Sequence, residues 1–267
     1  MNNISILLPY KENFSPDYPG AVSLYVKDTT MRSKYKKMIT VFGYTRFKNI
    51  FNLKYINIKL KKNIFSSGTK NYVQNFLKYE QDNPSDILEI HNRPIYLKFI
   101  ADKIGKTKIV LYFHNDPLTM SGSQTRTDRE YLLNIASKII FNSQWSKKRF
   151  LENLDNSAIN SDKLLVIYQS SDKPKINFNS KKKWITFVGK LNRAKGYDLF
   201  GNAVLKILNK YKDWKAIVIG DEPRATLNFK HPRLKNYGFM NHDKVLKIFE
   251  KTSIAVACSR WDEPLGR

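Results

Sequence analysis

The final residues of the chain combine side chains that could bind a phosphorylated, hydroxyl-rich ligand. A buried-strand pattern at Ile254 to Ala257 is followed by Glu263-Pro264-Leu265-Gly266-Arg267. The carboxylate can accept hydrogen bonds from sugar hydroxyls, and a glycine leaves backbone amides open to an anion. Because the turn follows a strand, we expect it at the carboxyl edge of a parallel sheet, where open α/β sheets bind ligands.

A second candidate is the basic loop from Gly189 to Gly196. A strand pattern ends at Gly189, three cations follow, and Gly196 precedes a helix pattern. Lys190 and Lys195 could converge on a diphosphate, aided by the positive end of the helix. Taken alone, the segment also fits a basic turn with no ligand.

Two histidines follow predicted strands. His114 comes directly after the apolar run Lys108–Phe113, so it lies where α/β sheets bind ligands. The alternative is a loop histidine held by Asp116. His91 ends a similar run and fits either a site residue or a structural role at the start of the next helix. No group of His or Cys residues has the spacing of metal ligands, so we expect no metal site.

Alternating strand and helix patterns predict an α/β fold with parallel sheets. No helix is predicted in the polar stretch after Pro9, which carries Gly20. The expected strands are Ile4–Leu8, Met38–Phe42, Tyr55–Ile58, Ile87–Ile90, Lys108–Phe113, Ile139–Phe141, Leu164–Tyr168, Trp184–Val188, Lys215–Ile219 and Ile254–Ala257. The expected helices are Asn71–Tyr79, Pro94–Ile104, Thr127–Ser137, Gln144–Leu151 with Ser143 as N-cap, Tyr197–Tyr211 and Asn241–Glu250.

The patterns divide the chain into two domains. Residues 1–172 form the first, the polar stretch 173–183 is a linker, and residues 184–267 form a short second domain. Three or four strands without a closing helix are few for a doubly wound domain. We therefore expect the second domain to be incomplete, as in a C-terminally truncated chain.

The chain has 267 residues and a formal net charge of +24, which favours anionic partners such as nucleotide phosphates, anionic lipid or nucleic acid. The charge also fits a background bias toward Lys, Asn and Ile, with the basic surface as a by-product. The single cysteine excludes an internal disulfide, and no apolar run is long enough for a membrane helix. We expect a cytoplasmic protein, with peripheral contact at the inner face of the membrane as an option.

Together the two loops resemble the motifs of the retaining glycosyltransferase family 4, which has the GT-B fold. The family shows Gly-Arg-Leu…Lys-Gly at the start of its second domain, and Ser-x-x-x-Glu-Pro-x-Gly later. Here these are Gly189-Lys190-Leu191…Lys195-Gly196 and Ser259 to Gly266. Tyr237-Gly238-Phe239 resembles the segment that borders the nucleobase, and Pro19-Gly20 stands in the place of the N-terminal glycine loop.

The resemblance implies two Rossmann-like domains whose parallel sheets face a cleft. It implies transfer of a hexose from a nucleoside diphosphate sugar to a glycan or lipid-linked acceptor, with retention and without a metal or other cofactor, as in cell-surface polysaccharide synthesis. His114 and Glu263 would act at the sugar. The implied donor-binding residues are Gly20, Lys190, Arg193, Lys195, Gly238, Phe239, Pro264, Leu265, Gly266 and Arg267.

The chain also departs from the family pattern. Lys190 replaces an arginine, which keeps the charge and loses the two-pronged contact with phosphate. The family's second glutamate would lie beyond Arg267. The alternative to an active enzyme is therefore a truncated, non-catalytic module that binds nucleotide or polyanions. Among its possible ligands we favour nucleic acid least, because no RNA-binding signature is present.

Overall fold

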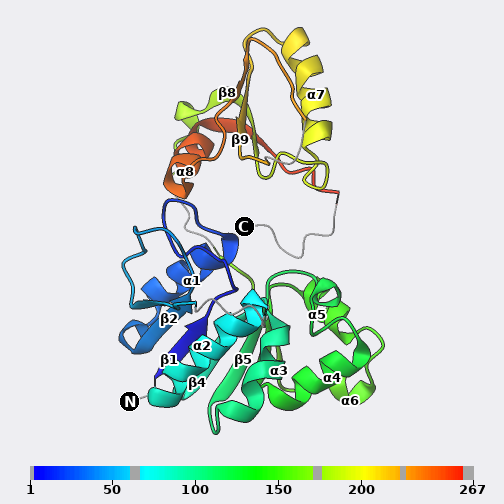
Figure 1. Ribbon diagram of the computed structural model, residues 1–267. Coiled ribbons are helices and arrows are strands. Elements are labelled where there is room, and N and C mark those ends of the chain that lie inside the picture. Colours follow the sequence, from blue (N-terminus) through cyan, green and yellow to red (C-terminus); the bar gives the residue numbers. More distant parts are fainter. Residues whose placement is uncertain (1–2, 61–66, 171–175, 223–226, 261–267) are drawn as a thin grey trace. The chain divides into compact units, whose positions relative to one another are not determined.

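The computed structural model describes residues 3–60, 67–170, 176–222 and 227–260. These residues form two compact units, one ending at residue 170 and one starting at residue 176. Each unit is an α/β structure built on its own parallel sheet (Figure 1).

The first unit is built on a sheet of seven parallel strands in the order β3-β2-β1-β4-β5-β6-β7. The strands are β1 (Ile4–Leu7), β2 (Ile39–Gly43), β3 (Tyr55–Asn57), β4 (Ile87–His91), β5 (Lys108–Phe113), β6 (Lys138–Phe141) and β7 (Leu164–Val166). Each coincides with a predicted strand to within a few residues. The central strands are almost continuously apolar because helices cover both faces.

Helices and short 3₁₀ turns connect these strands. They are α1 (Ala21–Arg32), η1 (Lys36–Met38), α2 (Gly68–Asp82), η2 (Pro94–Tyr96), α3 (Leu97–Ile100), η3 (Ala101–Lys103), η4 (Pro117–Thr119), α4 (Arg126–Ile135), α5 (Gln144–Leu151) and α6 (Asn156–Ile159). Ser143 caps α5 as predicted, by accepting a hydrogen bond from the Ser146 amide. A capping box formed by Thr125 and Asp128 begins α4.

Two buried clusters cover the faces of this sheet. On one face Ile6 and Leu8 of the first strand region pack with Val22 and Val26 of α1. On the other face Leu7 belongs to the larger cluster with residues of α2 to α5. Successive residues of β1 thus point to opposite faces, as in any strand.

The second unit has four parallel strands in the order β10-β9-β8-β11. Its elements are η5 (Phe178–Ser180), β8 (Lys182–Val188), α7 (Tyr197–Lys210), β9 (Lys215–Ile219), β10 (Leu234–Asn236), α8 (His242–Lys251) and β11 (Thr252–Val256). Phe200 and Val204 of α7 pack on one face of the sheet, and Val245 of α8 packs on the other. The predicted linker 173–183 overlaps β8 by two residues.

Three local predictions were wrong. Helix α1 was missed, because Val22, Val26 and Thr29 weaken its helical pattern. The helix expected at Pro94–Ile104 is split into η2, α3 and η3. Strand β10 was also missed, since its three residues, Leu-Lys-Asn, are too few to show a period.

Each sheet changes the direction of its strand order at one point. In the first unit this lies between β1 and β4, and in the second between β8 and β11. Loops that leave the carboxyl ends of the two strands at such a point diverge to opposite faces and leave room for a ligand. Most of the predicted site loops follow strands at or next to these positions, whereas the Gly238 segment follows the edge strand β10.

Candidate functional site

In the first unit the sheet register brings the two strand-end histidines together. His91 ends β4 and pairs with Tyr112 of β5, while His114 follows β5 by one residue. The His91 ring lies 4.4 Å from the Tyr112 ring and 5.2 Å from the His114 ring, centroid to centroid, with near-parallel planes. Tyr25 of α1 meets the His114 ring edge-on at 5.0 Å. His91 is therefore part of the same group as His114.

Both ring nitrogens of His114 have partners within this unit. The Gln169 side-chain amide donates to Nδ1, and Nε2 lies 2.9 Å from Nδ1 of His91. Because Nδ1 accepts, the proton of neutral His114 is on Nε2 and is donated to His91. His91 is 1% exposed, and its own Nε2 has no hydrogen bond; the Glu89 carboxylate lies 3.5 Å away. The contacts thus form a series that runs from Gln169 to His114, His91 and Glu89. This series fixes one tautomer for each histidine ring.

The backbone of His114 is also fixed. Its amide donates to Asn92 Oδ1 at 3.1 Å, and its carbonyl accepts from Asn142 Nδ2 at 2.9 Å. Asn92 has a φ of +57°, a backbone conformation that asparagine tolerates better than most residues. Two side chains from neighbouring loops therefore position this residue.

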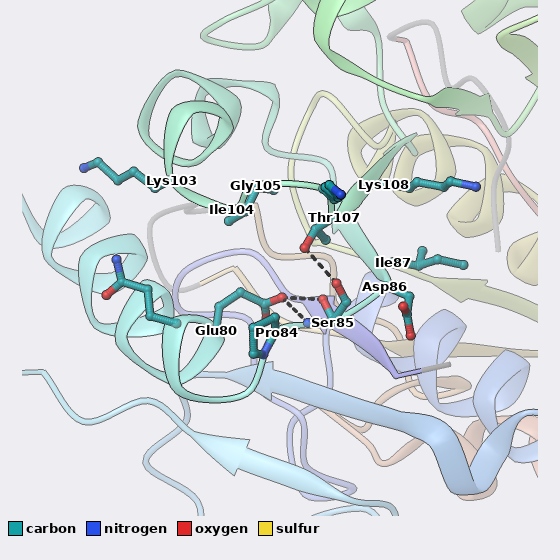
Figure 2. Close-up of a pocket in the computed structure, with 12 residues that line it drawn as sticks. Glu80, Pro84, Ser85, Asp86, Ile87, Lys103, Ile104, Gly105, Thr107 and Lys108 are labelled. Atoms are coloured by element: carbon teal, nitrogen blue, oxygen red, sulfur yellow. Dashed lines mark hydrogen bonds between the residues drawn. The ribbon is translucent and has the colours of Figure 1, made fainter. Parts of the chain in front are cut away.

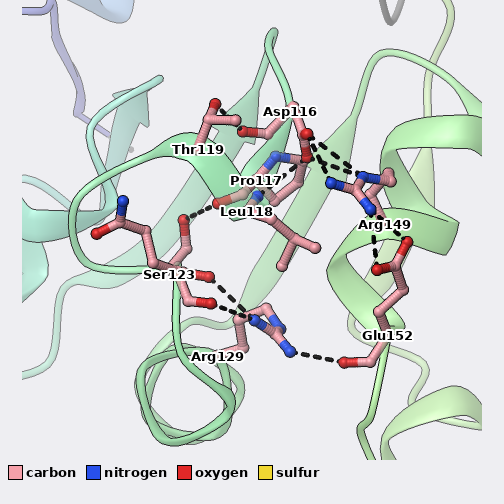
Figure 3. Close-up of polar contacts among 9 residues, drawn as sticks. Asp116, Pro117, Leu118, Thr119, Ser123, Arg129, Arg149 and Glu152 are labelled. Atoms are coloured by element: carbon pink, nitrogen blue, oxygen red, sulfur yellow. Dashed lines mark hydrogen bonds and ion pairs between the residues drawn. The ribbon is translucent and has the colours of Figure 1, made fainter. Parts of the chain in front are cut away.

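Ion pairs and carbonyl contacts hold the loop after His114 (Figure 3). Asp116 accepts from the Leu118 amide at 3.0 Å and pairs with Arg149 of α5, which also contacts Glu152. The buried Arg129 donates to the carbonyls of Ser123, Gln124 and Glu152. The alternative in which Asp116 holds His114 finds no support, because the Asp116 side chain contacts Leu118 and Arg149.

Gly20, predicted to contact the donor, lies at the N-terminus of α1 against a carboxylate. A Cβ added at Gly20 would come within 2.0 Å of Glu12 Oε1. Glu12 also accepts a hydrogen bond from the Ser23 amide at 3.0 Å, so it neutralises the positive end of α1. The glycine therefore leaves room for Glu12, and any anion at this helix end would meet that negative charge.

In the second unit the basic loop lies beside the exit of the neighbouring strand. The loop runs from Gly189, after β8, to Gly196, which caps α7, and β11 is the neighbour of β8. Within the described residues the Lys190 side chain is exposed and makes no hydrogen bond or ion pair. Arg193 is exposed, and Lys195 is half-buried with its amide donating to Asn192 Oδ1 at 3.0 Å. The predicted cations thus lie at the switch point, the place between β8 and β11 where the strand order changes direction, next to the N-terminus of α7.

Gly196 is required by close packing. Its φ is +72°, and an added Cβ would lie 1.9 Å from the Cys258 carbonyl oxygen. The Cys258 thiol donates to the Gly196 carbonyl at 3.1 Å. The residues after β11 therefore pack directly against the start of α7.

The predicted nucleobase segment joins the same edge of the sheet. The Gly189 amide donates to the carbonyl of Ile219 at the end of β9, and the Gly220 amide donates to the Gly238 carbonyl at 2.8 Å. Gly238 has a φ of +66°, and the neighbouring Phe239 is 39% exposed. The loops after β8, β9 and β10 are thus tied side by side, which brings Lys190, Gly238 and Phe239 to one edge.

Five predicted site residues lie outside the described residues. They are Glu263, Pro264, Leu265, Gly266 and Arg267. Their predicted roles therefore stay predictions. Contacts that the sequence reasoning missed include Gln169 with His114, and Arg260 with Asp198; both join residues more than 50 positions apart, which no local motif reveals.

A cavity of about 720 Å³ lies at the opposite, amino edge of the first sheet (Figure 2). It is lined by residues that precede β4 and β5, among them Ser85 and Thr107. The oxygens of its buried acid, Glu80, are already bonded to Ser5 and Ser85. We therefore assign a separate candidate region to the carboxyl edge of the sheet in each unit, and none to this cavity.

The described residues contain no group of three or more His, Cys, Asp or Glu side chains that could hold a metal ion. Among the same residues, no helix has the length and apolar content needed to cross a membrane.

Comparison with known proteins bears on the second unit directly. Residues 169–267 match the family model described as glycosyl transferases group 1. The match takes in the basic loop, the Gly238 segment and the residues that follow β11. A curated relative, "Putative glycosyltransferase YtcC" of Bacillus subtilis (strain 168), is 22% identical in an alignment of 214 residues that covers 68% of this chain. The chain spans about half (51%) of the length of that relative.

Solved structures resemble nearly the whole chain. Anabaena Alr3699/HepE in complex with UDP-glucose has a TM-score of 0.72 at 16% identity, covering 99% of this chain and 76% of its own. The catalytic domain of starch synthase IV from Arabidopsis thaliana, bound to ADP and acarbose, has a TM-score of 0.68 at 9% identity, with coverages of 100% and 80%. At these identities the likeness shows the fold, and it confirms the predicted α/β fold with the parallel sheets of GT-B glycosyltransferases.

Proposed function

We propose that the chain is a glycosyltransferase that moves a hexose from a nucleoside diphosphate sugar to a glycan or lipid-linked acceptor. The observation that carries this proposal is the grouping of Lys190, Lys195 and the N-terminus of α7 at the switch point of the second sheet. This grouping lies within the residues matched by the group 1 model. That HepE binds UDP-glucose supports a sugar nucleotide as the ligand class.

The proposed chemistry places growing negative charge on the leaving diphosphate. The ammonium groups of the two lysines and the positive end of α7 would stabilise that charge as the bond to the sugar breaks, without a metal. The exposed Phe239 ring offers a flat apolar surface for a nucleobase. Arg193, exposed beside the lysines, would add long-range attraction for the anion.

At the sugar we assign Glu263 to hydroxyl binding, with the amides near Leu265 and Gly266 and the charge of Arg267 supporting the diphosphate. His114 Nδ1 already accepts from Gln169, so a sugar hydroxyl reaches it by taking the place of that amide. Retention of anomeric configuration, hexose as the sugar, and a role in cell-surface polysaccharide synthesis belong to this proposal. It also includes a cytoplasmic location, with contact at the inner face of an anionic membrane.

Calorimetric titration with UDP, GDP and ADP sugars at moderate salt tests the proposal. We expect saturable binding that prefers one base, and a roughly tenfold loss of affinity in Lys190→Ala and Lys195→Ala, the size of one charge-assisted contact. Lys206→Ala is the matched control, because Lys206 is an exposed lysine farther along α7. Equal weakening by all three variants would contradict a localised site.

The second candidate function is a non-catalytic polyanion-binding module, which the net charge of +24 favours. It predicts binding to any polyanion, with no preference among nucleotides and a steep dependence on salt. The same titration, repeated at two salt concentrations, separates the two functions.

A further inference from the structure

One arginine ties the residues that leave β11 to the loop that precedes α7. Arg260 donates from its backbone amide to the Ala194 carbonyl at 2.9 Å, and from Nη1 to the Arg193 carbonyl at 2.8 Å. Its guanidinium also holds the Asp198 carboxylate with both prongs, at 2.5 and 2.7 Å. Three residues of the 193–198 segment are thus contacted by one residue about 65 positions away.

Cys258 makes a second connection two residues earlier. Its thiol donates to the Gly196 carbonyl, and its own carbonyl occupies the space where a side chain at position 196 would lie. The two connections bracket Lys195, whose amide is held by Asn192. The basic loop is therefore fastened at its C-terminal half, while Lys190 at its N-terminal half is exposed.

The guanidinium of Arg260 is occupied by these contacts. Asp198 takes both prongs, and its side chain is 18% exposed against 42% for Arg260. Arg260 holds the pKa of Asp198 below its usual value, so this pair is charged throughout the neutral range. An arginine engaged in this way acts on a ligand through the loop that it holds.

We propose that Arg260 is a positioning residue of the nucleoside diphosphate site. It locks the C-terminal half of the basic loop to the exit of β11, so that Lys195 and the start of α7 are held in place before the ligand arrives. Two loops that leave separate strands would otherwise have to be ordered on binding, and that cost would be subtracted from the affinity. The ligand named here rests on the proposed function; the lock itself does not.

The lock can be measured without any ligand, because Cys258 is the only cysteine in the chain. The rate at which a thiol reagent modifies the whole chain reports how often the contacts of Cys258 open. We expect Arg260→Ala to raise this rate at least about fivefold and to weaken UDP binding about tenfold, since ordering the loop would then oppose binding. Arg260→Lys should fall between, because lysine keeps the charge and loses the fork.

The variant Asp198→Asn tests whether Asp198 is the partner through which Arg260 holds the loop. It should reproduce much of the Arg260→Ala effect, and the double variant should be little worse than Arg260→Ala alone, because both changes break one interaction. Arg233→Ala is the matched control: Arg233 donates to the Tyr211 and Leu208 carbonyls at the other end of α7. Arg233→Ala should lower the melting temperature without changing the rate at which Cys258 is labelled or the affinity for UDP.

An unchanged labelling rate in Arg260→Ala, within a factor of two of the parent chain, would overturn the lock. A raised rate with unchanged UDP affinity would overturn the positioning role while leaving the proposed function intact. If the unaltered chain binds none of UDP, GDP and ADP, the proposed function fails, and the labelling rates still decide whether Arg260 locks the loop.

Discussion

The roles of individual residues depend on what already occupies their polar atoms. His114 has Gln169 on one ring nitrogen and His91 on the other, whereas the Lys190 side chain makes no polar contact within the described residues. The lysine is therefore ready to meet an anion. His114 can contact a sugar hydroxyl only after one of its present hydrogen-bond partners, such as Gln169, has been displaced.

The tautomer of His114 is a testable consequence of its contacts. At pH 8 we expect ¹⁵N spectra to show His114 protonated on Nε2, because the Gln169 amide donates to Nδ1. Gln169→Glu replaces that donor with an acceptor and should move protonation to Nδ1. Gln124→Glu, which adds the same charge at an exposed position of the same unit, should leave the tautomer unchanged. Protonated Nδ1 in the unaltered chain would contradict this assignment.

At the scale of single elements, one helix cap and two strands could be predicted residue by residue from the sequence. Ser143 was predicted as the N-cap of α5, and the structure confirms both the cap and the helix bounds. Strands β5 and β9 also begin and end where predicted, because each is an apolar run bounded by polar residues or glycine. Helix α1 escaped prediction because its β-branched residues obscure the helical period.

The capping box of α4 gives a prediction for stability. Thr125→Ala removes the acceptor for the Asp128 amide and should lower the free energy of unfolding by about 1 kcal/mol. Thr127→Ala, two residues into the same helix and exposed, should not lower it. Urea denaturation of both variants measures the difference. Equal losses would show that the box adds nothing beyond helix propensity.

The pair of Asp198 with Arg260 predicts a dependence on pH. The folded pKa of Asp198 is lowered from 3.8, so the pair stabilises the fold above that pH and loses this contribution as pH falls through the folded value. Asp198→Asn should therefore destabilise the chain at pH 7, and much less at pH 3. Urea denaturation at the two pH values checks this.

Asp213→Asn is the comparison for that experiment. The pKa of Asp213 is also lowered, by Lys183, but this pair is more exposed than the pair of Asp198 with Arg260. Its pH-dependent effect should be the smaller of the two, because water screens exposed charges. A larger effect at Asp213 would contradict the account of the pair.

At the scale of the whole molecule, the sequence predicted the α/β class and, apart from α1 and β10, the order of the main helices and strands, because alternating patterns determine both. It did not predict which side chains meet. Arg260 reaches Asp198, and His91 reaches His114, because β11 neighbours β8 and β4 neighbours β5. That strand order is a property of the folded sheet, and no local sequence motif predicts it. The placement of Glu12 against Gly20 is a similar case.

The net charge of +24 leads to a prediction about membranes. If the acceptor is lipid-linked, the chain should co-sediment with vesicles that contain anionic lipid and stay in solution with neutral ones. Raising the salt from about 50 mM to 500 mM should release it, since screening weakens surface attraction. Binding that persists at high salt, or that is equal for both vesicle types, would contradict a peripheral electrostatic contact.

The central claim is that the basic loop of the second unit binds the diphosphate of a sugar nucleotide. Its most direct test is calorimetric titration of the unaltered chain and of Lys195→Ala with UDP-glucose and UDP at moderate salt. We expect one saturable site, with an affinity about tenfold lower in the variant. Identical binding by the variant and the unaltered chain, or binding with no preference over other polyanions, would contradict it.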